Sequence, residues 1–351
     1  MPPFKVKDRE DNLAALRQSF RAGREEAPGP PAVLYLEATA SCNLRCPMCP
    51  TIIGLPRDPY RTRVFDLDLL PKIEPALPFV RRVFLSGGGE PLLHPRLFDI
   101  VRALKRHDLE IHFNSNATLM DQERARLILD TGVDTISFSI DGATPETYAR
   151  IRVGGNLDAV CENILFLAAE KKARGSRTPF LNMQFTAQRE NLAEIPEAVR
   201  LAAGLGINHL VIEPLTPVYN FDPEYRRYYQ AHVASPAEAL PLTRRAAALA
   251  AELGVLFTSH YLFAADHPEP PRVCAEPWLT FGVRVDGRVF TCCGMIEPMG
   301  DLAVSEFDAI WNGPAYRALR RALAAGTFPD CCALCVSENR ANHFNEDLLG
   351  G

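Results

Sequence analysis

Residues 33–49 read VLYLEATASCNLRCPMC, an apolar run that leads directly into three cysteines. The run VLYLEA predicts a buried strand. Cys42, Cys46 and Cys49 follow within eight positions, so one tight turn can aim three thiolates at a common point. Zinc closes its structural sites with four ligands, whereas three thiolates on a four-iron cluster leave one iron open for a non-protein ligand. The spacing therefore favours an iron–sulfur cluster over half a zinc site.

The composition is that of a folded chain without a strong charge. The 351 residues are 47% hydrophobic and 23% charged, so a sizeable core is expected. The 38 basic and 43 acidic residues are evenly mixed, which gives no electrostatic reason to expect nucleic acid or a membrane as a partner. The N-terminus lacks the pattern of a signal peptide, and no window reaches the length of a membrane span. We therefore predict a cytoplasmic protein, in which the ten cysteines serve as metal ligands or redox groups rather than disulfides.

Strand-like and helix-like segments alternate from residue 33 onward. The strand candidates are VLYLEA (33–38), RRVFLS (81–86), EIHFNSN (110–116), TISFSID (135–141), FLNMQFT (180–186) and HLVIEP (209–214). The helix candidates are residues 66–77, 96–107, 121–132, 157–173 and 192–206, with another at about 238–253. Such alternation predicts an α/β fold with a parallel sheet and right-handed crossovers. Six units are too few for a closed eight-unit barrel, so an open doubly wound sheet and a partial barrel both fit.

Polar residues gather where these strands end. The ends read GGGEP, NSNAT, SIDGA, TAQREN and EPLTP. The carboxyl edge of a parallel sheet is where such folds bind ligands. The three-cysteine loop follows the first strand, and it is therefore expected at this same edge.

The C-x3-C-x2-C spacing, its place after a first strand and the glycine-rich end of the second strand resemble the radical S-adenosylmethionine (SAM) superfamily. The resemblance covers residues 33–215 and implies a partial (β/α)6 barrel, a TIM-like radical SAM core. It implies that the open iron of a [4Fe–4S] cluster binds SAM and that the reduced cluster cleaves SAM to a 5′-deoxyadenosyl radical. A strongly reducing cluster suits this one-electron cleavage. The electron would come from an external donor such as flavodoxin or ferredoxin.

The resemblance also implies SAM-binding positions. Gly88 and Gly89 would let the backbone approach the SAM amino group. Asn114 lies where the family contacts the ribose and the methionine carboxylate, and Asn191 and Pro214 are similar to positions that line the adenosyl pocket. The full set predicted to bind SAM is Gly88, Gly89, Glu90, Asn116, Ser139, Asp141, Gln184 and Glu213. On the residues alone, the glycine stretch is equally typical of a tight strand-to-helix turn, and Asn114, Asn116, Ser139 and Asp141 are more typical of turn or capping residues.

A second group of cysteines lies between Cys274 and Cys335. FGVRVDGRVFTC (281–292) predicts a hairpin with its turn at Asp286-Gly287, and residues 308–326 predict one helix. The pattern resembles the SPASM or twitch domain of radical SAM enzymes, which implies a small cysteine-rich α+β domain with one auxiliary [4Fe–4S] cluster. The ligands predicted for that cluster are Cys274, Cys292, Cys332 and Cys335. A four-cysteine zinc ribbon is the alternative, and the doublets with Cys293 and Cys331 leave the register open.

Four parts of the chain are expected: an N-terminal extension (1–32), the radical SAM core (33–215), a connecting segment (216–265) and the cysteine-rich domain (266–351). The connecting segment is predicted to be a connection or a lid, because Pro, charge and tyrosines break the alternation. Its tyrosines are Tyr219, Tyr225, Tyr228 and Tyr229. Cys161 lies on an apolar helical face and is expected in the core. His112 and His209 are given no catalytic role.

The resemblance implies that the enzyme abstracts a substrate hydrogen, with the auxiliary cluster assisting oxidation. Sugar or aminocyclitol dehydrogenation and peptide modification are the substrate classes it implies. About thirty residues precede the first strand, too few for an independent leader-binding domain. This favours a small molecule, with a peptide maturase that cross-links or epimerises as the alternative. A non-catalytic iron–sulfur or zinc scaffold is the second alternative.

Overall fold

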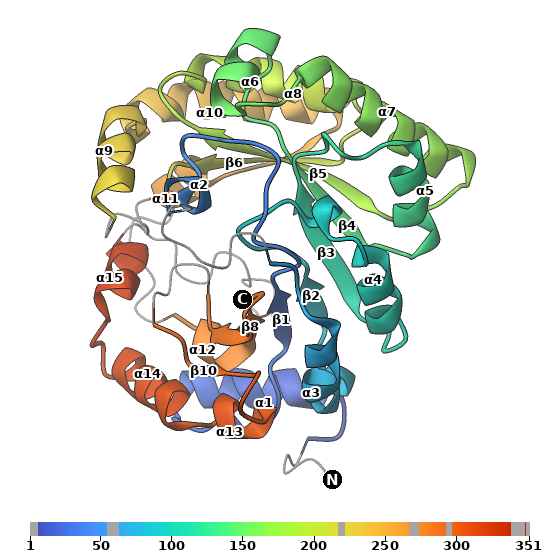
Figure 1. Ribbon diagram of the computed structural model, residues 1–351. Helices are drawn as coiled ribbons and strands as arrows, with labels where there is room; N and C mark the ends of the chain where they lie inside the picture. The colour runs from blue at the N-terminus through green and yellow to red at the C-terminus, as the bar shows by residue number, and fades with distance from the viewer. Residues whose placement is uncertain are drawn as a thin grey trace.

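The computed structural model describes residues 6–54, 63–216, 222–266, 274–292, 297–337 and 348. Its centre is one sheet of ten strands in the order β10-β9-β8-β1-β2-β3-β4-β5-β6-β7. Figure 1 shows these strands as an arc with helices α4, α5, α7, α8 and α10 on its outer side. No helix in the described part of the chain is both long and apolar enough to span a bilayer.

The elements of the first half are α1 (Arg9–Arg21), β1 (Val33–Leu36), α2 (Pro50–Gly54), η1 (Leu67–Leu69), α3 (Leu70–Ile73), η2 (Glu74–Phe79), β2 (Arg82–Phe84), η3 (Pro91–Leu93), α4 (Leu97–Lys105), β3 (Glu110–Ser115), α5 (Gln122–Asp130), β4 (Thr135–Ser139), α6 (Pro145–Ile151) and α7 (Leu157–Ala173). Those of the second half are β5 (Phe180–Ala187), η4 (Leu192–Glu194), α8 (Ile195–Gly204), β6 (His209–Pro214), α9 (Pro223–His232), α10 (Pro236–Leu253), β7 (Leu256–Ser259), α11 (His260–Asp266), α12 (Glu276–Leu279), β8 (Thr280–Val283), β9 (Arg288–Phe290), β10 (Gly300–Asp301), α13 (Phe307–Trp311), α14 (Pro314–Ala324) and α15 (Asp330–Ser337).

All six predicted strands are present as β1 to β6, and each pairs with the next in parallel. Their side chains alternate between a fully buried face under the helices and a half-buried inner face, as along β5. An additional strand that the sequence pattern did not reveal, β7, extends the parallel run beyond β6. The core lies between the buried face and the outer helices, and Cys161 of α7 packs against it as predicted.

Two predicted helices are wrong in extent. Residues 308–326 form two helices, α13 and α14, instead of one. Pro314 begins α14 because it lacks an amide hydrogen and disfavours helical backbone at the preceding residue. A Cβ on Gly313 would lie 2.4 Å from the Ala309 carbonyl oxygen, so the chain turns where only glycine fits. Residues 66–77 likewise form the short pieces η1, α3 and η2, interrupted by prolines.

The cysteine-rich region continues the same sheet. Strand β8 pairs in parallel with β1, and β9 and β10 follow antiparallel. The predicted hairpin is confirmed, with Gly287 in the left-handed region at φ 86°. An edge strand leaves backbone groups unpaired, and β8 satisfies those of β1. The α/β fold with a partial barrel is therefore confirmed, and the domain boundaries stay a prediction.

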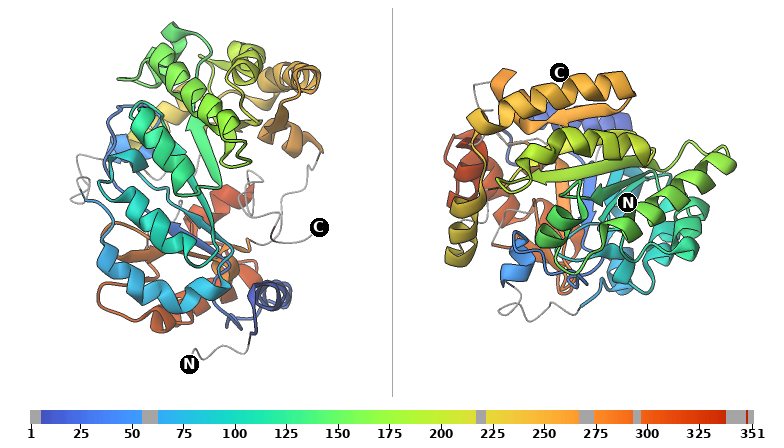
Figure 2. Two further views of the ribbon diagram at one scale, coloured as in Figure 1. Left: turned by 90° about the vertical axis from the view of Figure 1, so that its right-hand side faces the viewer. Right: turned by 90° about the horizontal axis from the view of Figure 1, so that it is seen from above.

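The N-terminal extension lies against the C-terminal helices, far from it in the sequence. The Trp278 indole donates to the Arg24 carbonyl at 2.7 Å, and the Trp311 indole donates to the Gly29 carbonyl at 2.8 Å. The buried Arg320 guanidinium donates to the Glu25 carbonyl at 3.0 Å. Figure 1 and Figure 2 show α1 near α12, α13 and α14 at one end of the molecule. The described part of the N-terminal extension and helices α12 to α14 thus form one packed region.

Candidate functional site

The three-cysteine loop lies at the carboxyl end of β1. Cys46 is buried, and Cys42 and Cys49 are half-buried. Burial raises the pKa of the Cys46 thiol to about 11, and the neighbouring Cys42 and Cys49 thiols add to this rise. The Cys49 amide donates to the Cys46 carbonyl at 3.0 Å, which closes the turn before α2. The three thiols thus lie close enough to influence one another electrostatically.

The glycine turn after β2 packs directly on this loop. The Glu90 amide donates to the Ser41 carbonyl at 2.8 Å. A Cβ on Gly89 would lie 2.2 Å from that same carbonyl oxygen and 2.4 Å from the Thr39 carbonyl oxygen. Glycine is therefore required here by the close approach of two backbone segments.

Glu90 faces the protein. Its buried carboxylate accepts hydrogen bonds from the Ser115 hydroxyl at 2.8 Å and from the backbone amide of Asn116 at 2.7 Å. Burial raises the pKa of this carboxyl group. The side-chain amide of Asn116 donates to Asn43 Oδ1 at 3.0 Å and lies 3.9 Å from Cys42 Sγ. Glu90 thereby fixes the turn after β3 against the cysteine loop.

An arginine that the sequence analysis missed, Arg152, joins Asp141 to the cysteine loop. Arg152 Nε lies 2.5 Å from Asp141 Oδ2, and Asp141 is fully buried. Arg152 Nη1 lies 4.0 Å from Cys46 Sγ. The other Asp141 oxygen accepts the Thr186 amide at 2.7 Å. The Asp141 carboxylate is thus committed to protein partners.

The other predicted positions lie at the same edge. Ser139 and Gln184 are opposite each other in the β4–β5 pairing, and both are half-buried. Glu213, also half-buried, lies opposite Thr186. Asn191 is buried and donates to the carbonyls of Asp141 and Thr186, which ties the ends of β4 and β5 together.

Helix α9 covers the site. Tyr228 and Tyr229 pack against the apolar cluster formed by Leu44, Cys46, Met48, Ile151 and Leu215. The Tyr228 hydroxyl donates to Gln188 Oε1 at 2.6 Å. Gln188 is fully buried, and within the described ranges its Nε2 has no hydrogen-bond partner. An unsatisfied buried donor at this edge is a feature that a bound ligand would satisfy.

The other two tyrosines of the connecting segment, Tyr225 and Tyr219, are not seen to cover the cysteine loop. Tyr225 is buried in the protein, with its hydroxyl on the Thr216 carbonyl at 2.8 Å. Tyr219 lies outside the described residues. The segment is therefore partly a packed helix and partly a cover over the cysteine loop, as a lid would be.

Both histidines lie on the inner face of the sheet. The rings of Tyr35 and Phe84 are stacked, with their centroids 4.7 Å apart. The centroid of the His112 ring lies 5.2 Å from that of Phe84. The His209 ring nitrogen Nε2 lies 2.8 Å from the Thr258 hydroxyl. Burial lowers the pKa of His209.

Three of the four cysteines predicted to bind the auxiliary cluster lie at one apolar cluster of side chains. Trp278, Phe290, Leu319 and Leu323 form that cluster, and it is in contact with three of the predicted auxiliary ligands: Cys274, Cys292 and Cys332. Cys335 lies one turn after Cys332 on α15, where residues three apart share a face. Cys293 lies outside the described residues, and the Cys331 side chain is not described.

The arrangement of the cysteine thiols suits iron–sulfur clusters. Across the ranges described, no three Cys, His, Asp or Glu side chains converge as one metal ion requires. A four-iron cluster makes a different demand, because each thiolate binds its own iron. Three adjacent thiols beside a close-packed glycine turn and the unsatisfied Gln188 amide match a cluster with a further ligand.

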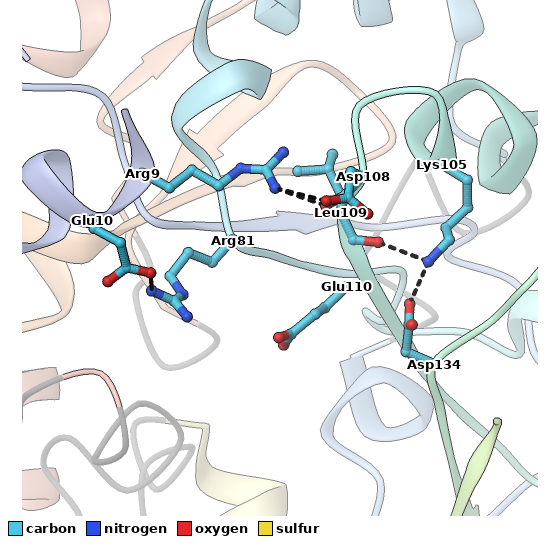
Figure 3. A pocket seen from close by; sticks show the side chains of 8 residues that line it. All are labelled: Arg9, Glu10, Arg81, Lys105, Asp108, Leu109, Glu110 and Asp134. Carbon is cyan, nitrogen blue, oxygen red and sulfur yellow. Dashed lines mark hydrogen bonds and ion pairs between the residues drawn. The ribbon is translucent and has the colours of Figure 1, made fainter. Parts of the chain in front are cut away.

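A pocket of about 280 Å³ lies at the opposite end of the sheet, where β2, β3 and β4 begin (Figure 3). Its charges are already paired: Arg81 lies 2.6 Å from Glu10, and Lys105 lies 2.9 Å from Asp134. Glu110 borders it, and hydrogen bonding to His112 lowers the pKa of Glu110 to about 2. This pocket is separate from the cysteine loop.

Comparisons with known families agree with this geometry. The radical SAM superfamily model matches residues 36–202, and the model of the SPASM iron–sulfur cluster-binding domain matches residues 274–336. The chain belongs to the radical SAM superfamily and carries a SPASM domain. Its cofactors are therefore SAM, a [4Fe–4S] cluster and auxiliary iron–sulfur chemistry in the SPASM domain, which favours a cluster over the zinc ribbon.

Curated relatives differ in how much they share with the chain. The PqqA peptide cyclase of Gluconobacter oxydans is 29% identical over 89% of this chain and 85% of its own length. The tungsten-containing aldehyde ferredoxin oxidoreductase cofactor-modifying protein of Pyrococcus furiosus is 30% identical over 53% of this chain, and the match spans only 52% of that protein. SuiB of Streptococcus suis, solved with its precursor peptide SuiA, has the same fold, with a TM-score of 0.67 and 12% identity over 89% of this chain and 70% of that one.

Proposed function

We propose that this radical SAM enzyme modifies a peptide. The observation that carries the proposal is the match to PqqA peptide cyclase, which runs through both the radical SAM region and the SPASM region at 29% identity. A shared arrangement of both domains supports a shared class of substrate. The peptide reading, given above as the alternative, is thus better supported than dehydrogenation of a sugar or aminocyclitol.

The cysteine loop, Cys42, Cys46 and Cys49, is proposed to hold the SAM-binding cluster. The residues proposed to surround SAM are Gly88, Gly89, Glu90, Asn116, Ser139, Asp141, Gln184 and Glu213. We divide these roles by how exposed and how well paired each group is. The glycine turn offers backbone, and the half-buried Ser139, Gln184 and Glu213 offer side chains. Glu90 and Asp141 act by holding neighbouring groups, because their carboxylates are already hydrogen-bonded or ion-paired within the protein.

The auxiliary cluster is proposed to bind Cys274, Cys292, Cys332 and Cys335. We assign residues 1–32 to an N-terminal extension, 33–215 to the core, 216–265 to the connection and 266–351 to the SPASM region. Electrons for SAM cleavage would come from an external carrier such as flavodoxin or ferredoxin.

When bound, the first cluster and SAM would supply a 5′-deoxyadenosyl radical, the species that would remove a hydrogen atom from the substrate. The chain contributes the enclosure: Tyr228 and Tyr229 cover the cysteine loop, and Arg152 and Asp141 place a fixed charge pair beside Cys46. Cross-linking two side chains removes two hydrogen atoms. One leaves in 5′-deoxyadenosine, and the other leaves as a proton whose electron needs an acceptor. Accepting that electron is the chemistry an auxiliary cluster would supply.

The experiment incubates reconstituted enzyme with SAM, a reductant and any short peptide encoded beside its gene. We expect the peptide to raise 5′-deoxyadenosine formation and to change in step with it. A cross-link lowers the peptide mass by two hydrogens, whereas epimerisation in D2O adds one deuterium. The Cys42→Ala variant serves as the control and should form no 5′-deoxyadenosine. Turnover of a sugar or aminocyclitol, with unchanged peptides, would overturn the proposal in favour of the small-molecule reading.

A further inference from the structure

Glu37, the residue directly after β1, connects the glycine turn to the SPASM hairpin. Its Oε1 accepts the Gly88 amide at 2.8 Å, and its Oε2 accepts the Val285 amide at 3.1 Å. Gly88 belongs to the turn after β2, and Val285 lies in the turn between β8 and β9. One carboxylate therefore spans two regions that are about 200 positions apart in the sequence.

The packing around Glu37 leaves it little freedom. A Cβ on Gly87 would lie 2.3 Å from Glu37 Cγ, so the glycine turn closes directly over this side chain. A Cβ on Gly88 would lie 2.8 Å from Thr51 Oγ1, which belongs to α2 immediately after the cysteine loop. The Gly88 peptide is thus held between Glu37 and the end of the cysteine loop.

The hairpin that Glu37 contacts through Val285 continues to Cys292, one of the predicted auxiliary ligands. The Glu37 amide also donates to the Val283 carbonyl at 2.9 Å, so the β1–β8 ladder continues up to this residue. Strand β9 returns from the hairpin turn to Phe290, and Cys292 follows two residues later. A shift of the glycine turn would therefore be passed through Glu37 to the hairpin that carries Cys292.

We propose that Glu37 is a positioning residue that couples SAM binding at the glycine turn to the SPASM hairpin. This inference rests on the proposed role of the glycine turn in holding SAM. A coupling of this kind is reciprocal, so the state of the hairpin also alters the affinity for SAM. The carboxylate is suited to the role because it accepts two hydrogen bonds at once, one for each region.

Hydrogen–deuterium exchange of the fully reconstituted chain tests the coupling, with and without saturating SAM. Two segments are compared: the glycine turn at 86–90 and the hairpin at 283–288. In the wild type, we expect SAM to slow exchange in both, by roughly fivefold or more in the hairpin. In Glu37→Gln, the turn should stay protected while the hairpin loses its response, because an amide has one acceptor oxygen and turns its NH2 toward the second donor.

Glu276→Gln is the matched control. Glu37 is half-buried, and Glu276 is a buried carboxylate that accepts the Thr280 hydroxyl at 2.6 Å. Glu276 belongs to α12 rather than to the glycine turn or the hairpin. This variant should keep the response of the hairpin to SAM. A wild-type hairpin that ignores SAM while the turn is protected would overturn the coupling alone. Absence of protection in the turn itself would overturn the proposed SAM role of that turn, and the coupling with it.

Discussion

The two cysteine sites of this enzyme are built in opposite ways. The first takes three thiols from one loop of eight residues, and the turns that follow the neighbouring strands pack on that loop. The second is proposed to use Cys274, Cys292, Cys332 and Cys335, and the first three of these come from separate segments and contact one apolar cluster. The first site depends on close approach of backbone, and the second on long-range packing.

The supporting residues differ accordingly. At the first site, Arg152 and Asp141 form a buried ion pair beside Cys46. At the second, the side chains of Trp278, Trp311 and Arg320 donate hydrogen bonds to backbone carbonyls of the N-terminal extension. We therefore expect the first site to fail through local changes, and the second to fail when the N-terminal extension separates from helices α12 to α14.

The largest effect is expected from Gly89→Ala, which should break the first site alone. The new methyl group would collide with the Ser41 and Thr39 carbonyls, so the turn must move away from the cysteine loop. We expect 5′-deoxyadenosine formation to fall to background, while the iron of the SPASM region stays. Gly204→Ala is the control, because nothing lies within 4 Å of its added Cβ. Equal activity in the two variants would contradict the close packing assigned to the turn.

Arg152→Met tests the hidden ion pair of the first site. Removing the cation leaves the fully buried Asp141 charged and unpaired, which costs about 3–5 kcal/mol. Urea unfolding of anaerobic protein measures the loss in the free energy of unfolding. Adding Asp141→Asn to this variant should restore a large part of it. A double variant no more stable than Arg152→Met would show that the pair is not the cause.

The strands and the cysteine loop could be predicted because their signals are local, whereas the residues that support the sites could not. Arg152 reads from the sequence as one more charge on a helix, and only its contact with Asp141 gives it a role. The hydrogen bond from Trp278 to Arg24 joins positions 254 residues apart, which no periodicity reveals. Residues 308–326 are a different case, because Gly313-Pro314 is a local signal for the break that the helical pattern around it outweighed in the prediction.

Arg320→Met should break the second site while sparing the first. The guanidinium donates to the carbonyls of Pro277, Glu25 and Trp311, and methionine can preserve only its packing against the rings. We expect a loss of about 3 kcal/mol in the free energy of unfolding. Iron analysis should show a preferential loss from the SPASM region.

Arg321→Met is the matched control for Arg320, because Arg321 forms an exposed ion pair with Glu25 at 2.6 Å. Exposed pairs add little to stability, so this variant should unfold almost as the wild type does. Equal losses in the two arginine variants would contradict the role given to the buried one.

The smallest effect is expected from Trp278→Phe, which sharpens the comparison at the second site. The change removes the 2.7 Å bond to the Arg24 carbonyl and keeps most of the ring packing against Phe20. A loss of about 1 kcal/mol in the free energy of unfolding is expected. SAM cleavage should not change. A fall in cleavage as large as that of Gly89→Ala would mean that the two sites do not fail separately.

The most direct test is the iron content of anaerobically reconstituted enzyme, measured with 5′-deoxyadenosine formation. Wild-type protein is compared with the variant that carries Cys42→Ala, Cys46→Ala and Cys49→Ala. Two separate four-iron sites predict about eight irons per chain in the wild type and about four in the variant, which should not cleave SAM. A variant that still cleaves SAM, or that keeps only zinc in the SPASM region, would contradict the account.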